Sequence, residues 1–346
     1  MNQNKNAASF VISSTCGSVP SFALLVVAIV SVAASPIRAQ VPVNTVIATV
    51  NVGREPFGVV VSPDSKFVYV ANILDNTVSV IRAKTNKVKT ALFAGASPIG
   101  LAVSSDGSKL YVSNSTNPGT VTVIDLANGN STQTITGLGP NPSGLALTPD
   151  GKQLWVADAG GDTVDVIDTS NNQVLTPIIV GAPPRYVAFT PDGLKAYVSA
   201  LHKVVLAIDT ASQTVTRSIR VGNAPQGIAI TPDGGTAYVL NFHIYTDREA
   251  FSVIDTTNDT LIKKNFAGSS GAPGEQPAIL SFKGQSYLYF PEYEIGGVAV
   301  ISIQNPNTVV GGFRCPDPDN VVIAPNGTRA YVTNSGNDDV TVVQIQ

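Results

Sequence analysis

The stretch that decides the fold is LTPDGKQLWVADAGGDTVDVIDT, residues 147–169. A similar stretch, VSSDGSKLYVSNSTNPGTVTVID, occupies residues 103–125, and another, ITPDGGTAYVLNFHIYTDREAFSVID, occupies residues 230–255. Self-similarity at a regular spacing is the signature of a repeat architecture. A proline precedes each unit, and these prolines define seven units: Pro56, Pro98, Pro142, Pro184, Pro225, Pro277 and Pro318.

Each unit contains the same order of strand and turn patterns. A short apolar run of small and β-branched residues, such as GLALT at 144–148, suits a crowded inner strand. A turn such as TPDG at 148–151 follows, in which proline presets φ, aspartate closes a local hydrogen bond and glycine accepts a left-handed conformation. A second and a third strand come next, as in YVSN at 111–114 and TVTVID at 120–125, and then a more polar fourth strand such as QTVTRSIRVG at 213–222.

Four strands per unit without any helical pattern, at a period of about 40 to 45 residues, are typical of the blades of a β-propeller. The sequence therefore predicts an all-β fold, a seven-bladed β-propeller of four-stranded antiparallel blades. A linear β-solenoid is the alternative, but its repeats are much shorter.

The two ends of the repeat region predict how the ring closes. The last unit stops after its third strand, DVTVVQIQ at 339–346, and NTVIATVNVG at 44–53 matches the pattern of a fourth strand. We expect this N-terminal strand to complete the last blade, because the pairing would remove an open sheet edge.

The first 39 residues differ from the repeats. Lys5 is followed by the apolar run FALLVVAIVSVAA at 22–34 and by SPIRAQ at 35–40, a pattern typical of a secretory signal peptide cleaved after Ala39. A retained membrane anchor is the alternative, but the apolar run is shorter than the roughly 20 residues of a spanning helix. We therefore expect a signal peptide over 1–39, a single propeller domain over 40–346, and a secreted, periplasmic or cell-surface protein without a transmembrane anchor after cleavage.

Charge and cysteine content narrow the classes of partner. Removal of residues 1–39 takes away Lys5 and Arg38 and no acid, so 19 basic residues face 24 acidic ones, a formal charge of −5. A nucleic-acid partner is therefore not expected. Cys315 would be the single remaining thiol, which leaves no internal disulfide to stabilise the fold.

The repeated strands carry a family resemblance. The strands YVAN at 69–72, YVSN at 111–114 and YVTN at 331–334, with their SPD or TPDG turns, resemble the YVTN family of β-propeller repeats over residues 44–346. The resemblance implies the propeller fold, and members of the family include bacterial and archaeal cell-surface and periplasmic proteins without one shared activity. A more distant similarity to the seven-bladed propeller lactonases implies a hydrolase as a second possibility.

Known chemical motifs are missing from the sequence, so candidate residues were sought where one unit departs from the others. The loops between second and third strands vary most, and in three neighbouring units His202, His243 and Glu292 each stand five residues after the strand tyrosine. Histidine and glutamate together can bind a divalent metal. Independent polar loop residues are the alternative explanation, and no other cofactor is expected.

Further singular residues belong to the same predicted face, and with the metal candidates they make up the predicted ligand or partner site. Solvated loop charges explain most of them singly, but their gathering with aromatic residues predicts a recognition surface at the channel mouth. The predicted site consists of Arg185, Tyr186, His202, His243, Tyr245, Arg248, Glu292 and Tyr293, and Glu275 and Asp319 are also singular there.

Two functions follow from this surface. The first is an exported, non-catalytic propeller that binds a protein, glycan or envelope polymer. The second is a lactonase-like or other metal-assisted hydrolase with its metal or general base drawn from His202, His243 and Glu292. The sequence favours binding, because no nucleophile, base and oxyanion donor can be placed together.

Overall fold

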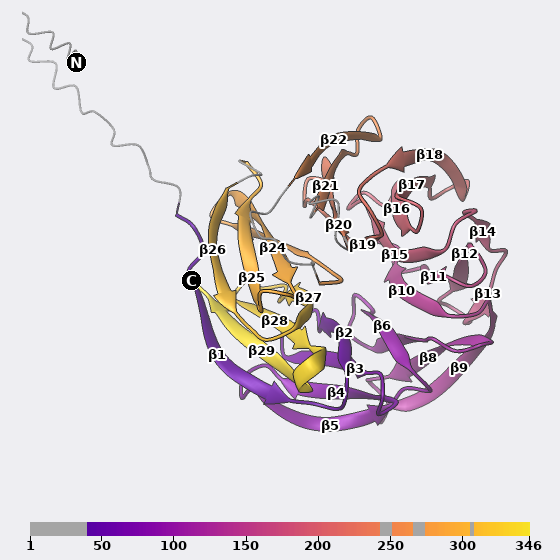
Figure 1. Cartoon of the computed structure of the whole chain (residues 1–346). Helices are drawn as coiled ribbons and strands as arrows, with labels where there is room; N and C mark the ends of the chain where they lie inside the picture. Colours follow the sequence, from indigo (N-terminus) through magenta and orange to yellow (C-terminus); the bar gives the residue numbers. More distant parts are fainter. Residues whose placement is uncertain (1–39, 243–250, 266–273, 305–307) are drawn as a thin grey trace, which may run out of the picture. The chain divides into compact units, whose positions relative to one another are not determined.

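A computed structural model describes residues 40–242, 251–265, 274–304 and 308–346. Within these residues, seven antiparallel sheets surround a common axis, and the chain proceeds from one sheet to the next (Figure 1). The predicted seven-bladed propeller is therefore confirmed. The predicted signal peptide lies outside the described residues, and among the residues that are described no helix is long and apolar enough to cross a membrane.

We number the blades along the chain, and each of the first six contains consecutive strands. The strands of blades 1 to 3 are β2 (Pro56–Val61), β3 (Phe67–Asn72), β4 (Thr77–Arg82), β5 (Lys87–Phe93), β6 (Pro98–Val103), β7 (Lys109–Asn114), β8 (Gly119–Asp125), β9 (Ser131–Leu138), β10 (Pro142–Leu147), β11 (Gln153–Asp158), β12 (Thr163–Asp168), β13 (Gln173–Val174) and β14 (Ile178–Ile179). Those of blades 4 to 6 are β15 (Pro184–Phe189), β16 (Lys195–Ala200), β17 (Val204–Asp209), β18 (Thr214–Arg220), β19 (Pro225–Ile230), β20 (Thr236–Asn241), β21 (Phe251–Asp255), β22 (Thr260–Asn265), β23 (Ala278–Phe282), β24 (Gln285–Glu292), β25 (Gly297–Ser302) and β26 (Val309–Arg314).

Blade 7 joins the two ends of the repeat region. It contains β27 (Pro318–Ile323), β28 (Arg329–Asn334), β29 (Asp339–Ile345) and β1 (Asn44–Asn51), with a short 3₁₀ helix, η1 (Ser335–Asn337), before β29. Strand β1 pairs antiparallel with β29 from Asn44 opposite Ile345 to Asn51 opposite Asp339. Backbone bonds between Val43 and Gln346 extend this ladder beyond the strands. The predicted closure by the N-terminal strand is confirmed.

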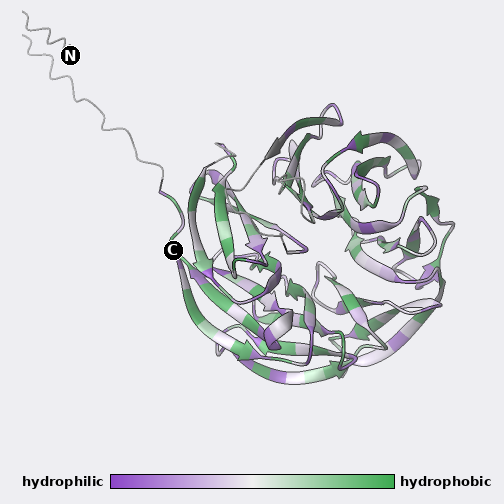
Figure 2. Cartoon of the chain, viewed as in Figure 1, coloured by the Kyte–Doolittle hydropathy of each residue, from purple (hydrophilic) through white to green (hydrophobic). Residues whose placement is uncertain are grey.

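The burial of each strand follows its place in the blade. The second and third strands are buried on both faces, as in β3, whose residues after Phe67 are all buried, because neighbouring blades cover them. The fourth strands lie at the periphery and are mostly exposed, as in β5 and β18. Figure 2 shows hydrophobic residues on strands throughout the ring, including the peripheral β1.

The repeated proline–aspartate turns are held as the sequence predicts. In blade 3, Thr148 Oγ1 donates to Asp150 Oδ1 at 2.7 Å, and it accepts a bond from the backbone N–H of Gln153 at 3.1 Å. Gly151 adopts φ of +72°, a left-handed conformation that glycine reaches without a steric penalty. Blade 3 departs from the pattern in its fourth strand, which is split into β13 and β14; Pro177 lies between them and has no N–H to donate to the ladder.

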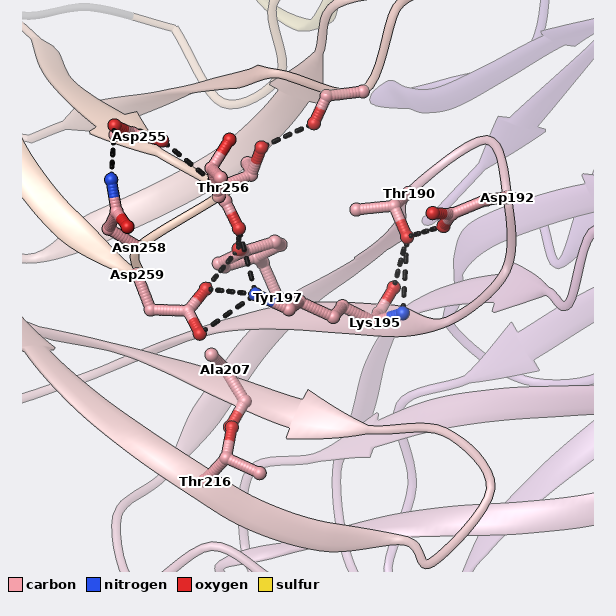
Figure 3. A network of polar contacts seen from close by, with 12 residues as sticks. Thr190, Asp192, Lys195, Tyr197, Ala207, Thr216, Asp255, Thr256, Asn258 and Asp259 are labelled. Atoms are coloured by element: carbon pink, nitrogen blue, oxygen red, sulfur yellow. Dashed lines mark hydrogen bonds and ion pairs between the residues drawn. The ribbon is translucent and has the colours of Figure 1, made fainter.

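Adjacent blades are joined by polar contacts near these turns (Figure 3). Lys195, the first residue of β16 in blade 4, donates to both carboxylate oxygens of Asp259 in blade 5 at 3.0 Å and to the carbonyl of Thr256 at 2.8 Å. The buried Tyr197 donates its hydroxyl to Asp259 as well, at 2.5 Å. A similar link joins Lys109 in blade 2 to the carbonyl of Thr169 in blade 3.

Replacement of Lys195 by methionine is expected to destabilise the protein by about 1.5 kcal/mol, because the mostly buried side chain of Asp259 loses the cation that it pairs with. The measurement is the urea midpoint of unfolding. Lys152→Met is the matched control, since the Lys152 side chain is 81% exposed and pairs only with Asp150 of its own turn. Equal midpoints for the two variants would show that the contact does not hold the blades together.

Candidate functional site

The inner strands begin around a central cavity. In six blades we define the channel mouth by the second residue of the inner strand: Phe57, Ile99, Ser143, Arg185, Gln226 and Asp319. In blade 6 the residue in the equivalent place is Glu275, which precedes β23 in the chain. The cavity below has a volume of about 160 Å³, and its lining includes Phe57, Ile99, Tyr186, Gln276 and Asn320. The mouth is thus apolar on blades 1 and 2 and polar on the other blades.

Glycines set the close spacing of the inner strands. A Cβ added at Gly58 would lie 2.2 Å from the carbonyl oxygen of Ile99, and one added at Gly100 would lie 2.6 Å from that of Ser143. In the other blades this third position holds Gly144, Tyr186, Gly227, Gln276 or Asn320. Blades 4, 6 and 7 therefore add polar side chains where the other four blades have none.

Arg185 of blade 4 extends toward blades 5 and 6. Its Nε donates to Gln226 Oε1 at 3.2 Å, and its Nη2 lies 4.0 Å from Glu275 Oε2. The side chains of Arg185 and Glu275 are 35% and 18% exposed, so solvent reaches the guanidinium more than the carboxylate. Gln226 orients the guanidinium, which keeps further N–H groups for a ligand.

Glu275 and Asp319 bring two acidic groups to the same side of the mouth. The backbone N–H of Glu275 donates to the Asp319 carbonyl at 2.6 Å, and the Asp319 carboxylate accepts a bond from the N–H of Ser335 at 3.0 Å. Burial raises the pKa of Glu275 to about 7, although the positive charge of Arg185 opposes the rise. Burial likewise raises the pKa of Asp319 to about 6. Glu275 can therefore donate or accept a proton near neutral pH.

Three buried polar atoms near the mouth have no hydrogen-bond partner within the described residues: Tyr186 Oη, Glu275 Oε2 and Asn320 Oδ1. Asn320 donates its amide to the Phe57 carbonyl at 2.9 Å, which fixes the side chain and leaves its oxygen available. The ring of Tyr186 lies against Gly144 of blade 3, and burial raises the pKa of its hydroxyl well above the usual range. Buried polar groups are seldom left without a partner, so these atoms mark a place for a polar ligand or ordered water.

The structure places the predicted site residues unequally. Arg185 and Tyr186 belong to the mouth, whereas His202 is exposed in the turn after β16 with φ of +73°. Glu292 is buried as the last residue of β24, and Tyr293 is 40% exposed in the following turn. His243, Tyr245 and Arg248 lie outside the described residues.

The metal hypothesis depends on His243 and stays a prediction. His202 lies two residues after the end of β16 at Ala200, whereas Glu292 is the last residue of β24. Among the residues that the structure describes, no group of three histidine, cysteine or acidic side chains could hold a metal ion. Cys315 is 2% exposed in an apolar cluster, where burial raises its thiol pKa to about 12.

Sequence reasoning missed Gln226 and Asn320. The sequence marks both by their distance from the proline that precedes the unit. Gln226 directly follows Pro225, and Asn320 is two residues after Pro318. A comparison of the units by distance from the proline would have found both, since Phe57 and Gly58 occupy the same places in blade 1.

Comparison with known proteins supports the fold and adds one suggestion about activity. Hydrazine synthase of Kuenenia stuttgartiensis is similar in structure, with a TM-score of 0.74 and 24% sequence identity over 84% of this chain and 95% of that chain. Similarity at this identity shows the fold alone. No curated protein sequence matches the chain. The family described as "Lactonase, 7-bladed beta-propeller" matches residues 45–200, which is less than half of the chain.

Proposed function

We propose that the protein is an exported binding protein whose channel mouth takes a polar group of an envelope glycan. The observation that carries the proposal is a set of buried atoms without hydrogen-bond partners in the part of the chain that the structure describes, Tyr186 Oη, Glu275 Oε2 and Asn320 Oδ1, of which Glu275 Oε2 faces the Arg185 guanidinium at 4.0 Å. A ligand that carries several hydroxyl or amide groups offers both donors and acceptors, so it could pair with these atoms. The signal-peptide pattern of residues 1–39 supports export.

The chemistry of the mouth favours a glycan fragment that carries a carboxylate. Arg185 offers planar N–H donors suited to a carboxylate. Phe57 and Ile99, on the opposite side of the mouth, offer an apolar surface to the face of a sugar ring. The formal charge of −5 expected after cleavage makes a strongly acidic polymer an unfavourable partner. The expected ligand therefore carries an isolated carboxylate, not a negative charge on every repeat unit.

Calorimetry with a soluble peptidoglycan fragment, a disaccharide carrying its short peptide, tests the proposal. Arg185→Ala is expected to weaken binding by about tenfold or more, because a charge-assisted hydrogen bond is lost. Tyr186→Phe is expected to weaken it by about fivefold through loss of the hydroxyl. Arg217→Ala, a change of the same kind on the exposed strand β18, is the control and should leave the affinity unchanged. Absence of binding to the unaltered protein, or equal affinity of all variants, would refute this function.

Hydrolysis of a lactone is a second candidate, and the match to the lactonase family over residues 45–200 favours it. Glu275, whose pKa is raised to about 7, would act as a general base toward water, and Arg185 would stabilise the negative charge that develops on the lactone oxygen. With simple aliphatic lactones as substrates, the rate should rise with pH up to about 7 and then level off, because the base works when deprotonated. Glu275→Gln should abolish turnover; retained turnover in that variant would exclude this mechanism.

A further inference from the structure

Blade 3 differs from its neighbours at a buried polar contact between the second and third strands. In blades 1, 2, 5 and 7 the second strand ends on an asparagine, whose amide donates to hydroxyl groups of the third strand. In blade 1, for example, Asn72 donates to Thr77 and Ser79, both at 3.0 Å. In blade 3 the strand register puts Asp158 in the place of the asparagine and Asp165 in the place of Ser79. Two carboxyl groups thus replace an amide donor and a hydroxyl.

Both carboxyl groups are enclosed by the fold. Asp158 has no exposed surface and Asp165 is 4% exposed. Asp165 accepts a bond from the N–H of Gly139 at 3.1 Å, and the Thr163 hydroxyl lies between the two side chains, at 3.5 Å from Asp158 and 3.4 Å from Asp165. Asp158 Oδ1 is buried without a hydrogen-bond partner. Backbone N–H groups of Gly160 and Gly161 reach Asp158, but they do not supply a positive charge.

The segments packed around the pair contain no compensating cation. Residues 137–147, which include β10, carry no charged side chain, and neither do residues 175–183, which include β14. The turn between β11 and β12 adds only the acidic Asp162, and Asp168 lies at the opposite end of β12. Arg185 of blade 4 is directed to Gln226 and Glu275, away from blade 3.

We propose that Asp158 and Asp165 share a single proton in the folded protein, which takes the place of the amide hydrogen donated in the other blades. One carboxyl group carries the proton and donates it to the Thr163 hydroxyl, which donates in turn to the other carboxylate, and this second carboxylate stays ionised. Two neighbouring carboxylates without a cation cannot both stay ionised in a buried place at small cost, and the proton removes one of the charges. Blade 3 therefore contains a group that loses its proton, and with it an internal hydrogen bond, as the pH rises.

The direction of the pH dependence follows from the raised pKa values. Burial, with the charge of Asp165 as a second cause, raises the pKa of Asp158 to about 6, and burial raises the pKa of Asp165. In the unfolded chain both groups titrate near pH 4. The stabilising proton is therefore fully present below about pH 4 and is lost as the pH rises through about 6.

Thermal unfolding of the full chain between pH 4.5 and 7.5 tests the proposal. Asp158→Asn restores the amide of the other blades, so the variant should melt higher than the unaltered protein at pH 7.5, by on the order of 5 °C, with the difference shrinking toward pH 4.5. Asp150→Asn, the same chemical change in an exposed turn of the same blade, should leave the pH profile unchanged, because the pKa of Asp150 is lowered by its bond to Thr148. Carboxyl carbon NMR of labelled aspartate should show one of the pair protonated at pH 5.

Three results would overturn the shared proton. The first is a parallel pH profile for the unaltered protein and Asp158→Asn, confirmed with Asp165→Asn. The second is a lower melting temperature of Asp158→Asn at pH 7.5, or its failure to fold, since an amide in this place should be tolerated. The third is a divalent metal that copurifies with the protein and is lost from the variant, because a metal ion would then neutralise the pair. The outcome is independent of ligand binding at the channel mouth.

Discussion

A chain that lacks residues 41–52 is expected to lose its single cooperative unfolding transition. Strand β1 is the fourth strand of blade 7, and within the described residues it is the strand of the N-terminal end that pairs in one sheet with the C-terminal end. Its removal breaks about five ladder bonds at roughly 1 kcal/mol each, a loss comparable with the total stability of many domains at ~5 to 15 kcal/mol. It also exposes the edge of β29 to other chains.

The physical reason is that β1 acts on more than its own blade. Val50 of β1 is 5% exposed and packs in one cluster with Val59 and Val70 of blade 1 and with Tyr331 and Val342 of blade 7. The strand also contacts β26 of blade 6 and β5 of blade 1. Its loss therefore weakens the contact between blades 7 and 1, where the ring closes.

A variant in which the residues of β1 are moved to the C-terminus distinguishes the loss of ring closure from the loss of the residues themselves. Since Val43 lies opposite Gln346 and Asn44 opposite Ile345, residues 43–52 fused after Gln346 through an Asn-Gly turn can form a hairpin with β29 in the native register. This rearranged chain should recover most of the melting temperature that the deletion loses, as measured by calorimetry. An unchanged transition in the deleted chain, or no recovery in the rearranged one, would contradict the role assigned to β1.

The sequence was sufficient for the architecture because the determinants of a blade are local and are repeated. The Thr148–Asp150–Gly151 turn is encoded within four residues, and the same pattern at 190–193 and 231–234 gives the same turn. The closure was also predictable. The N-terminal end of the repeat region has a strand pattern that belongs to no unit, and the C-terminal unit lacks its fourth strand. The split of the fourth strand of blade 3 around Pro177 was not anticipated.

The candidate site was predicted only in part, because it depends on how different blades converge. Arg185 stood out as a charged residue beside an anchor proline, but its partners Gln226 and Glu275 are 41 and 90 residues away in the chain, in other blades. The grouping of His202 with Glu292 rested on counting residues from the strand tyrosine, and it stays a prediction: β16 ends at Ala200 before His202, whereas β24 extends to Glu292. The raised pKa values of Glu275 and Asp319 come from burial, which the sequence does not display.

Gly58→Ala is expected to destabilise the protein by about 3 kcal/mol or more, which is large for the addition of one methyl group. The new Cβ would lie 2.2 Å from the carbonyl oxygen of Ile99 on the next inner strand, and a backbone atom cannot move aside as the end of a flexible side chain can. Relief requires blades 1 and 2 to separate. Because β1 closes the ring, blades 1 and 2 cannot separate without changing the contacts between the other blades.

Two further variants show whether the effect comes from the close approach of the strands. Gly311→Ala in β26 adds the same methyl group where no atom lies within 4 Å, so it should change stability by less than about 1 kcal/mol. In blade 6, Ala278 of β23 lies opposite Tyr289, and there β23 pairs with β24 without the bulge seen in blade 1. Ala278→Gly should therefore cost only about 1 kcal/mol through added freedom of the unfolded chain. Urea unfolding of the three variants gives the comparison, and a stability of Gly58→Ala equal to that of Gly311→Ala would mean that the inner strands can move apart without cost.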